Sequence, residues 1–190
     1  MRDDIILCGV GGQGTVLASR LLSTAAMRRG VPVKAAETIG MAQRGGSVTS
    51  HVRIGEGVSS PLVGRGGANL LMAFEPAEAV RQLAYVRQGG TVVVSNRPIV
   101  PVSAVTGGPT YDLDAIMGYL EQRVDNLVVV DADAAAAELG SSRVLNVVLL
   151  GAAIRSGAIS LDADDIREAI SIRLPERFWE LNLRALDWAH

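Results

Sequence analysis

Two glycine-rich segments carry the residues best suited to hold an anion. The first, Gly9-Val10-Gly11-Gly12-Gln13-Gly14, has the G-x-G-x-x-G pattern. Glycines permit a tight turn and a close approach to a ligand, and the free N–H groups of a following helix favour a negative charge. The second, Arg44-Gly45-Gly46-Ser47, places a guanidinium beside backbone N–H groups, which suits a carboxylate, a phosphate or a pyrophosphate. The expected binding residues are therefore Gly9, Gly11, Gly12, Gln13, Gly14, Thr15, Arg44, Gly45, Gly46 and Ser47.

Both segments have plainer alternatives: a turn that needs glycine only for packing, and a loop whose Arg44 meets solvent. The order of elements favours the ligand site. An apolar run of strand length, Ile5–Cys8, precedes the first segment, and residues 15–29 follow with apolar side chains at helical spacing. Strand, glycine loop and helix therefore come in the order that an anion site requires.

Further apolar runs predict the sheet that positions these loops. They cover residues 31–36, 70–74, 91–94 and 127–130, with a helix expected at 77–87. Continuous apolar strands that alternate with helices are typical of a mostly parallel sheet covered on both faces. Ligands bind at the carboxyl ends of such strands. The polar residues expected to gather there with the glycine loop are Glu37, Glu75, Asn96 and Asp131.

One region departs from this pattern. Val48, Ser50, Val52 and Ile54 alternate with Thr49, His51 and Arg53, and Gly55-Glu56-Gly57 then leads to residues 58–63. This predicts an antiparallel hairpin of 47–54 with 58–63, inserted after the second parallel strand. The C-terminal third is predicted to be helical, over 141–156, 164–174 behind an Asp162 cap, and 176–188. The expected fold is α/β and three-layered, with a mostly parallel, doubly wound sheet, within one domain spanning residues 1–190.

No complete catalytic set is present in the sequence. His51 is expected on the solvent side of its strand, Cys8 as a small buried residue, and Asn146 as a satisfied core asparagine. Thr49 stands where the last glycine of a G-x-S-x-G nucleophile elbow would be. This chain alone is therefore not expected to carry out a reaction.

The composition of the chain excludes several classes of partner and of metal site. The 190 residues have a net charge of −2 and no strongly basic stretch, so nucleic acid and anionic membranes are not expected as partners. One cysteine and two histidines exclude a disulfide framework and a four-cysteine cluster, and a zinc or iron site is not expected. No apolar run reaches the ~20 residues of a membrane span, and Asp3 and Asp4 argue against a secretory signal. A cytoplasmic protein is expected.

Glu37 leaves a second interpretation open. It follows Gly14 by 23 residues, close to the position at which a dinucleotide-binding fold places an acid on the ribose hydroxyls. Taken alone, this spacing favours a stand-alone NAD- or FAD-binding oxidoreductase domain.

Several blocks along the chain resemble one family. They are residues 9–19, Gly40-Met41-Ala42-Gln43-Arg44-Gly45-Gly46-Ser47-Val48, 50–53, Ala73-Phe74-Glu75-Pro76 and 146–151. Together they are similar to the gamma-type subunits of 2-oxoacid:ferredoxin oxidoreductases, and most similar to the small subunits of the indolepyruvate branch. The resemblance covers nearly the whole chain, and its glycine- and arginine-containing block is more specific than the glycine loop.

The resemblance implies a function shared between chains. The family oxidatively decarboxylates a 2-oxoacid, such as indolepyruvate or pyruvate, to an acyl-coenzyme A and passes electrons to ferredoxin. Thiamine diphosphate and [4Fe-4S] clusters are then expected on a larger partner subunit. Both glycine-rich segments are expected either to cradle coenzyme A or to contact that subunit. With 48% hydrophobic residues, the isolated chain is also expected to self-associate through the surface meant for its partner.

Overall fold

The computed structural model describes residues 2–38, 45–101 and 110–188. Its six described strands form one sheet in the order β2-β3-β1-β4-β5-β6. The strands are β1 (Asp3–Val10), β2 (Val33–Thr38), β3 (Ser47–Ile54), β4 (Ala68–Ala73), β5 (Val86–Ser95) and β6 (Asn126–Val130). β1, β4, β5 and β6 pair in parallel, whereas β3 is antiparallel to both of its neighbours. The predicted mostly parallel sheet is therefore confirmed.

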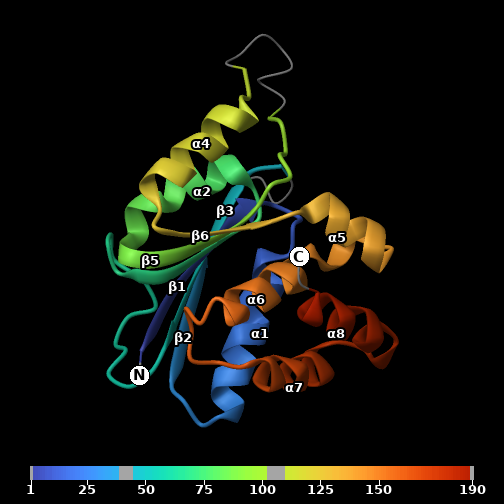
Figure 1. Ribbon diagram of the computed structural model, residues 1–190. Helices are drawn as coiled ribbons and strands as arrows, with labels where there is room; N and C mark the ends of the chain where they lie inside the picture. Colours follow the sequence, from blue (N-terminus) through green and yellow to red (C-terminus); the bar gives the residue numbers. More distant parts are fainter. Residues whose placement is uncertain (1, 39–44, 102–109, 189–190) are drawn as a thin grey trace.

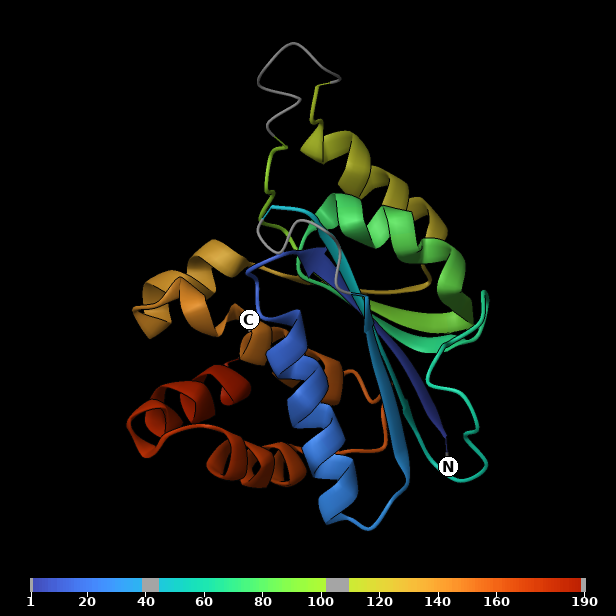
Figure 2. The same cartoon turned by 180° about the vertical axis from the view of Figure 1, so that it is seen from behind.

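Helices cover both faces of the sheet (Figures 1 and 2). One face packs against α1, α6, α7 and α8, and the other against α2 and α4. Along β1, Ile5 and Leu7 enter the first core, and Ile6 and Cys8 enter the second. The described helices are α1 (Thr15–Arg28), α2 (Pro76–Gln82), α4 (Leu113–Arg123), α5 (Ala132–Leu139), α6 (Leu145–Arg155), α7 (Ala163–Arg173) and α8 (Trp179–Asp187), with short 3-10 turns at Leu83–Tyr85, Ser142–Val144 and Glu176–Phe178.

The C-terminal third is helical, as predicted. Asp162 caps α7 by accepting a hydrogen bond from the Asp165 N–H at 3.0 Å, and the Asp165 carboxylate accepts one from the Asp162 N–H at 2.8 Å. This reciprocal pair satisfies N–H groups that the helix itself leaves unpaired. None of the helices in the described part of the chain is long and apolar enough to span a bilayer.

The helix predicted for residues 77–87 ends earlier than expected, and the strand predicted for residues 91–94 begins earlier. α2 ends at Gln82, and β5 already begins at Val86. Gly89 and Gly90 mark a loop in the sequence, yet they lie inside β5, where the register with β4 shifts. Gly89 has φ +69°, and a Cβ on Gly90 would lie 3.0 Å from the Ala68 carbonyl oxygen. The two glycines therefore permit an irregularity within the strand.

The predicted antiparallel hairpin of 47–54 with 58–63 is wrong, although residues 47–54 do form an antiparallel strand. β3 pairs with β2, from Val33 opposite Ile54 to Thr38 opposite Thr49, and inserts between β2 and β1. Residues 58–63 form no strand. They lie along β3, where the Arg53 guanidinium donates to the carbonyl oxygens of Ser60 and Leu62 at 3.0 and 3.1 Å. Pro61 has no N–H to contribute to a strand ladder, which is consistent with this outcome.

His51 is buried, and its predicted solvent-facing position is wrong. Residues 58–63 cover its face of β3, and the His51 Nδ1 accepts a hydrogen bond from the Val63 N–H at 3.1 Å. The ring also meets Tyr85 edge to face, with 5.7 Å between ring centroids. Burial lowers the pKa of His51 below its ordinary value of 6.5, so the folded protein favours the neutral ring.

This burial predicts a loss of stability in mild acid. As pH falls below about 6.5, the unfolded chain binds a proton at His51 before the folded chain does. The free energy of unfolding is therefore retained above that pH and decreases from it down to the folded-state pKa. We expect His51→Gln to flatten the fall in melting temperature between pH 7 and pH 5. An unaltered slope in His51→Gln would contradict this account.

Candidate functional site

The glycine loop joins the end of β1 to the start of α1. Gly12 and Gly14 have φ +105° and +89°, a conformation that residues with a Cβ rarely adopt. Gly14 is the N-cap of α1, it has no side-chain cap, and the first turn contains no acidic residue. The first N–H groups of a helix have no partner within the helix. The positive end of α1 is thus left available to an anion.

Two of the predicted binding residues hold the loop together instead. The Gln13 Oε1 accepts a hydrogen bond from the Val10 N–H at 2.7 Å, and its Nε2 donates to the Phe74 carbonyl at 2.8 Å. A Cβ on Gly9 would lie 2.9 Å from the Phe74 Cβ. Gly9 and Gln13 therefore lock the glycine loop onto the end of β4.

The second glycine segment lies directly against the first. The Gly11 N–H donates to the Gly46 carbonyl at 2.8 Å, and the Gly45 N–H donates to the Gly11 carbonyl at 3.4 Å. The next residue, Ser47, donates through its hydroxyl to the Glu78 Oε2 at 2.5 Å. The fold thus brings the described part of the predicted site together. Arg44 lies outside the described residues.

A cavity of about 550 Å³ opens beside the glycine loop. Its floor includes Val48 and Ser50 of β3, and its wall is the first turns of α1. The lining residues are Gly11, Gly12, Gly14, Thr15, Val16, Leu17, Arg20, Glu37, Val48 and Ser50. Four residues of the predicted set therefore line one cavity, and Glu37 joins them.

Two hydroxyl groups of this cavity have no hydrogen-bond partner among the described residues. Thr15 is 4% exposed and Ser50 is 2% exposed, and neither side chain forms a hydrogen bond with a described residue. Glu37 and Arg20 also form no ion pair within the described ranges. Buried polar groups in proteins are normally hydrogen-bonded. Unpaired hydroxyls that line a cavity are therefore available to a bound ligand.

Glu37 lies farther from the glycine loop than the acid of a dinucleotide-binding fold. In that fold the acid-bearing strand is adjacent to β1. In this protein β3 separates β2 from β1, which adds one strand spacing of ~4.8 Å. Glu37 therefore reaches the cavity from its far side, across Ser50.

The other polar residues predicted at this edge serve the fold. Asp131 caps α5, and its hydrogen bonds from backbone N–H groups, chiefly that of Ala134, lower its pKa. The Asn96 Oδ1 accepts a hydrogen bond from the Ala132 N–H at 3.1 Å. Glu75 caps α2 by accepting one from the Glu78 N–H at 3.0 Å. These side chains are therefore occupied by helix ends rather than available to a ligand.

Two buried carboxylates brace the loops from the other face of the sheet. Glu75 is 1% exposed and accepts hydrogen bonds from the Tyr111 hydroxyl and the Ile99 N–H, and Glu78 is paired with Arg81. Burial, and then the hydrogen bond to Glu75, raise the pKa of Tyr111. No group of three or more His, Cys, Asp or Glu among the described residues is arranged to hold a metal ion.

Cys8 and Asn146 are both in the core. Cys8 is fully buried, as predicted, and burial followed by the nearby Glu78 and Glu75 carboxylates raises the pKa of its thiol. A protonated, buried thiol is a poor nucleophile. The Asn146 side chain packs against Gly14, but its Oδ1 has no donor among the described residues. The expectation of a satisfied asparagine is therefore wrong at that oxygen.

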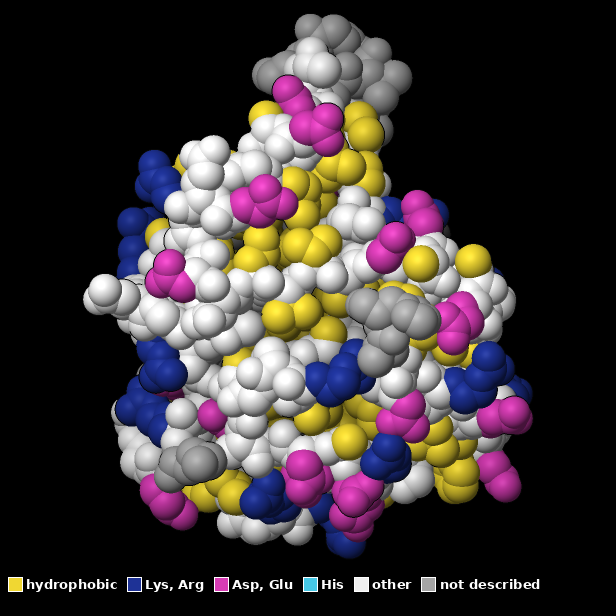
Figure 3. All heavy atoms as spheres, viewed as in Figure 1, with side chains coloured by type: hydrophobic (Ala, Val, Ile, Leu, Met, Phe, Trp, Pro, Cys, Tyr) yellow, Lys and Arg dark blue, Asp and Glu magenta, His cyan; other side chains and the backbone are white. Residues whose placement is uncertain are grey.

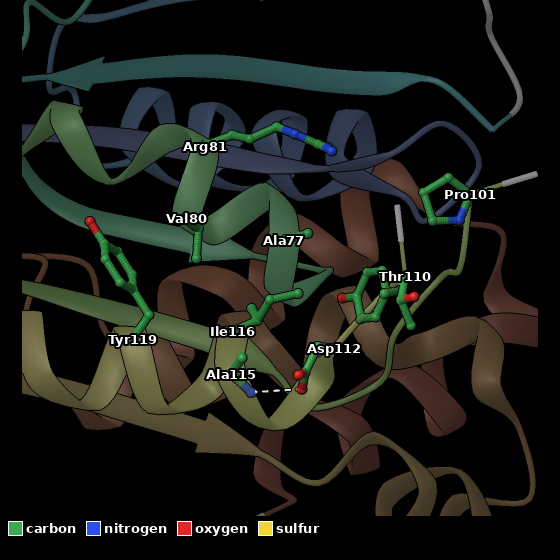
Figure 4. Close-up of a pocket in the computed structure, with 10 residues that line it drawn as sticks. Ala77, Val80, Arg81, Pro101, Thr110, Asp112, Ala115, Ile116 and Tyr119 are labelled. Atoms are coloured by element: carbon green, nitrogen blue, oxygen red, sulfur yellow. Dashed lines mark hydrogen bonds between the residues drawn. The ribbon is translucent and has the colours of Figure 1, made fainter. Parts of the chain in front are cut away.

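A second cavity, of about 460 Å³, lies between α2 and α4. Figure 4 shows Ala77 and Val80 of α2 on one side and Ile116 and Tyr119 of α4 on the other. Pro101 closes one end, and the neighbouring Ile99 and Val100 are 38% and 48% exposed. Apolar side chains gather on this face beside and below α4 (Figure 3). This surface is suited to contact another protein.

Arg20, Val48 and Ser50 line the cavity but were not predicted from the sequence as site residues. Signals for them were present. Arg20 follows Val16 by four residues and Leu17 by three, so all three share a face of α1. Val48 and Ser50 alternate along β3 and share a face of the strand.

Comparisons with known proteins agree with this fold. The sequence model of the family described as pyruvate ferredoxin/flavodoxin oxidoreductase matches residues 4–190. The indolepyruvate oxidoreductase subunit IorB of Archaeoglobus fulgidus is 40% identical over 191 residues, which cover 100% of this chain and 94% of that protein. The gamma subunit of a keto/oxoacid ferredoxin oxidoreductase from Geobacter sulfurreducens has a similar structure, with a TM-score of 0.70, 24% identity, and 97% and 94% of the two chains covered.

A longer protein contains the same fold as one part. The 2-oxoglutarate:ferredoxin oxidoreductase of Magnetococcus marinus, solved with 2-oxoglutarate, coenzyme A and succinyl-CoA bound, matches with a TM-score of 0.69 and 21% identity. The match covers 98% of this chain but 30% of that one. In that protein the fold is therefore joined to other parts within a single chain.

Proposed function

We propose a place for this chain in a larger enzyme, starting from the fact that it belongs to the pyruvate ferredoxin/flavodoxin oxidoreductase family. It is the small subunit of a thiamine diphosphate-dependent 2-oxoacid:ferredoxin oxidoreductase. The complex converts a 2-oxoacid and coenzyme A to an acyl-coenzyme A and carbon dioxide, and two electrons pass to ferredoxin. The observation that carries the proposal is the 40% identity to an indolepyruvate oxidoreductase subunit along the whole chain.

The residues of this chain indicate which cofactors must lie on another subunit. Its single cysteine is buried and cannot supply the four thiolates of a [4Fe-4S] cluster. The clusters therefore require another polypeptide, and we assign them, together with thiamine diphosphate, to a larger, cytoplasmic partner subunit. This chain, as one domain, completes the complex.

Coenzyme A fits the cavity beside the glycine loop in its chemistry. The positive end of α1 suits a phosphate, the Thr15 and Ser50 hydroxyls suit polar groups, and Val16, Leu17 and Val48 form apolar walls. When bound, coenzyme A supplies the thiol that accepts the acyl group. The residues of this chain would hold its anionic part and exclude water from it.

A stand-alone NAD- or FAD-binding domain is the second candidate, because Glu37 does line the cavity. The inserted β3 counts against it, since the carboxylate is displaced by one strand from the usual ribose position. The family match counts against it as well. The candidate would require NAD or FAD to bind the isolated chain.

The large subunit is expected to contact the apolar surface beside α4. The exposed residues Ile99 and Val100 directly precede Pro101, which lines the cavity between α2 and α4. Without that partner, the isolated chain is expected to self-associate through the same surface.

The proposal predicts that 2-oxoacid oxidation activity depends entirely on the large subunit. The purified chain should be colourless and should show no 2-oxoacid oxidation with a viologen dye, because its single cysteine cannot hold a [4Fe-4S] cluster and thiamine diphosphate is assigned to the partner. Adding the large subunit should produce coenzyme A-dependent reduction of ferredoxin, measured under anaerobic conditions. Each subunit assayed alone serves as the control. Activity of the isolated chain, or binding of NAD or FAD to it, would contradict the proposal.

A further inference from the structure

Two residues that line the cavity, Glu37 and Ser50, lie on the side away from the glycine loop. Glu37 of β2 lies directly opposite Ser50 of β3, and Ser50 lies opposite Leu7 of β1. Leu7 packs into the core under α1, so Glu37 and Ser50 face the same side of the sheet. Side chains of directly opposed residues stand ~5 Å apart. They nevertheless form no hydrogen bond with each other among the described contacts.

The two sides of the cavity have opposite chemistry. The α1 end offers N–H donors and a positive potential, whereas Glu37 offers only acceptor oxygens once ionised. An anion held at α1 is stabilised there, and a second phosphate at Glu37 would be repelled. The buried Ser50 hydroxyl between them has no partner among the described residues, so it can bind either group.

We propose that Glu37 and Ser50 form a subsite for a neutral hydrogen-bond donor, an amide N–H or a hydroxyl, on the ligand whose phosphate lies at α1. This inference rests on the proposed function. For coenzyme A, it places the pantetheine portion at Glu37 and directs the 3′-phosphorylated ribose away from it. Glu37 then acts as a specificity-determining residue, because it rejects a phosphate on its side of the cavity.

The test uses the reconstituted complex with coenzyme A and with dephospho-coenzyme A, which lacks the 3′-phosphate. Glu37→Gln retains an acceptor but replaces a charge-assisted hydrogen bond with a neutral one, a difference of roughly five- to tenfold in affinity. We expect KM to rise by about that factor for both compounds, with kcat changed by less than about twofold. Ser50→Ala should raise both KM values in the same direction. Glu56→Gln removes an equal charge from the exposed turn after β3 and is the matched control.

Three results would overturn the subsite. The first is a lower KM for coenzyme A alone in Glu37→Gln, which would place the 3′-phosphate beside the carboxylate. The second is no change in either KM. The third is loss of co-purification with the large subunit, which would assign Glu37 to a cationic side chain of the partner. Failure of the proposed function is distinguishable, because wild-type turnover would then not depend on coenzyme A at all.

Discussion

Replacing Gly151 with alanine is expected to lower the free energy of unfolding by roughly 1–3 kcal/mol, the usual cost of overpacking a core. Gly151 lies in α6, where the helix meets the end of α8. A Cβ at this position would come within 2.1 Å of the Leu186 carbonyl oxygen and 3.1 Å of the Arg155 Nη1. That carbonyl already accepts a hydrogen bond from Arg155 at 3.0 Å, and backbone cannot rotate away as a side chain can. α8 must therefore shift.

Gly118→Ala is the matched control and should have the opposite sign. Gly118 lies inside α4, and a Cβ there would meet no atom within 4 Å. Alanine at such a helix position is expected to stabilise the protein by roughly 0.5–1 kcal/mol. Thermal unfolding separates the two variants, at about 2–4 °C per kcal/mol for a chain of this size. Equal melting temperatures for Gly151→Ala and the wild type would refute the packing of α6 against α8.

Residues 146–151 form one of the blocks that resemble the family, but the sequence alone gives this block no structural role. In the structure its two ends are packing contacts, because Asn146 abuts Gly14 and Gly151 abuts α8. Neither contact has a local sequence signal, since the partners lie 132 and 35 residues away along the chain. Tertiary contacts of this kind are not encoded in periodicity.

The sheet was predictable wherever a strand is buried on both faces. Residues 5–8, 70–73 and 92–94 are buried, continuous apolar runs, and each lies in a parallel strand. The pairing of β3 was not predictable from its alternation, which fits either neighbour equally well. Placing β3 between β2 and β1 depends on long-range contacts, among them the covering of His51 by residues 58–63.

The same insertion limits how well the site could be predicted. The glycine loop and Thr15 follow from the order of strand, loop and helix and were predicted, whereas the contact of Gly45 and Gly46 with this loop follows from the pairing of β3 with β1. Ser50 was assigned correctly to a face of its strand, but not to a cavity, because no local pattern reveals which strand lies beneath α1. The predicted position of Glu37 rested on its spacing from Gly14 along the chain. That spacing does not show that β3 lies between β2 and β1.

The glycine loop itself should be the most sensitive element for ligand binding. Gly14→Ala introduces a Cβ at φ +89°, and this Cβ would lie 2.8 Å from the Asn146 Nδ2 at the edge of the cavity. The left-handed backbone costs a residue with a Cβ about 1–2 kcal/mol. Relief of both strains must move the first N–H groups of α1 away from the position at which we propose that an anion binds. Gly30→Ala, at φ +71° with no atom within 4 Å, carries the same backbone strain at the other end of α1 and is the control.

In the reconstituted complex, Gly14→Ala and Arg44→Ala are both expected to raise the KM for coenzyme A by roughly 10- to 100-fold. For Arg44 this follows from a charge-assisted contact of ~1.5–3 kcal/mol at ~1.4 kcal/mol per tenfold change. Gly30→Ala should lower the melting temperature but leave the KM unchanged, which separates strain from ligand binding. Loss of co-purification with the large subunit in both Gly14→Ala and Arg44→Ala would assign the two loops to the subunit interface. If assembly and KM are both unchanged, these loops hold no ligand, and their glycines serve only the turn.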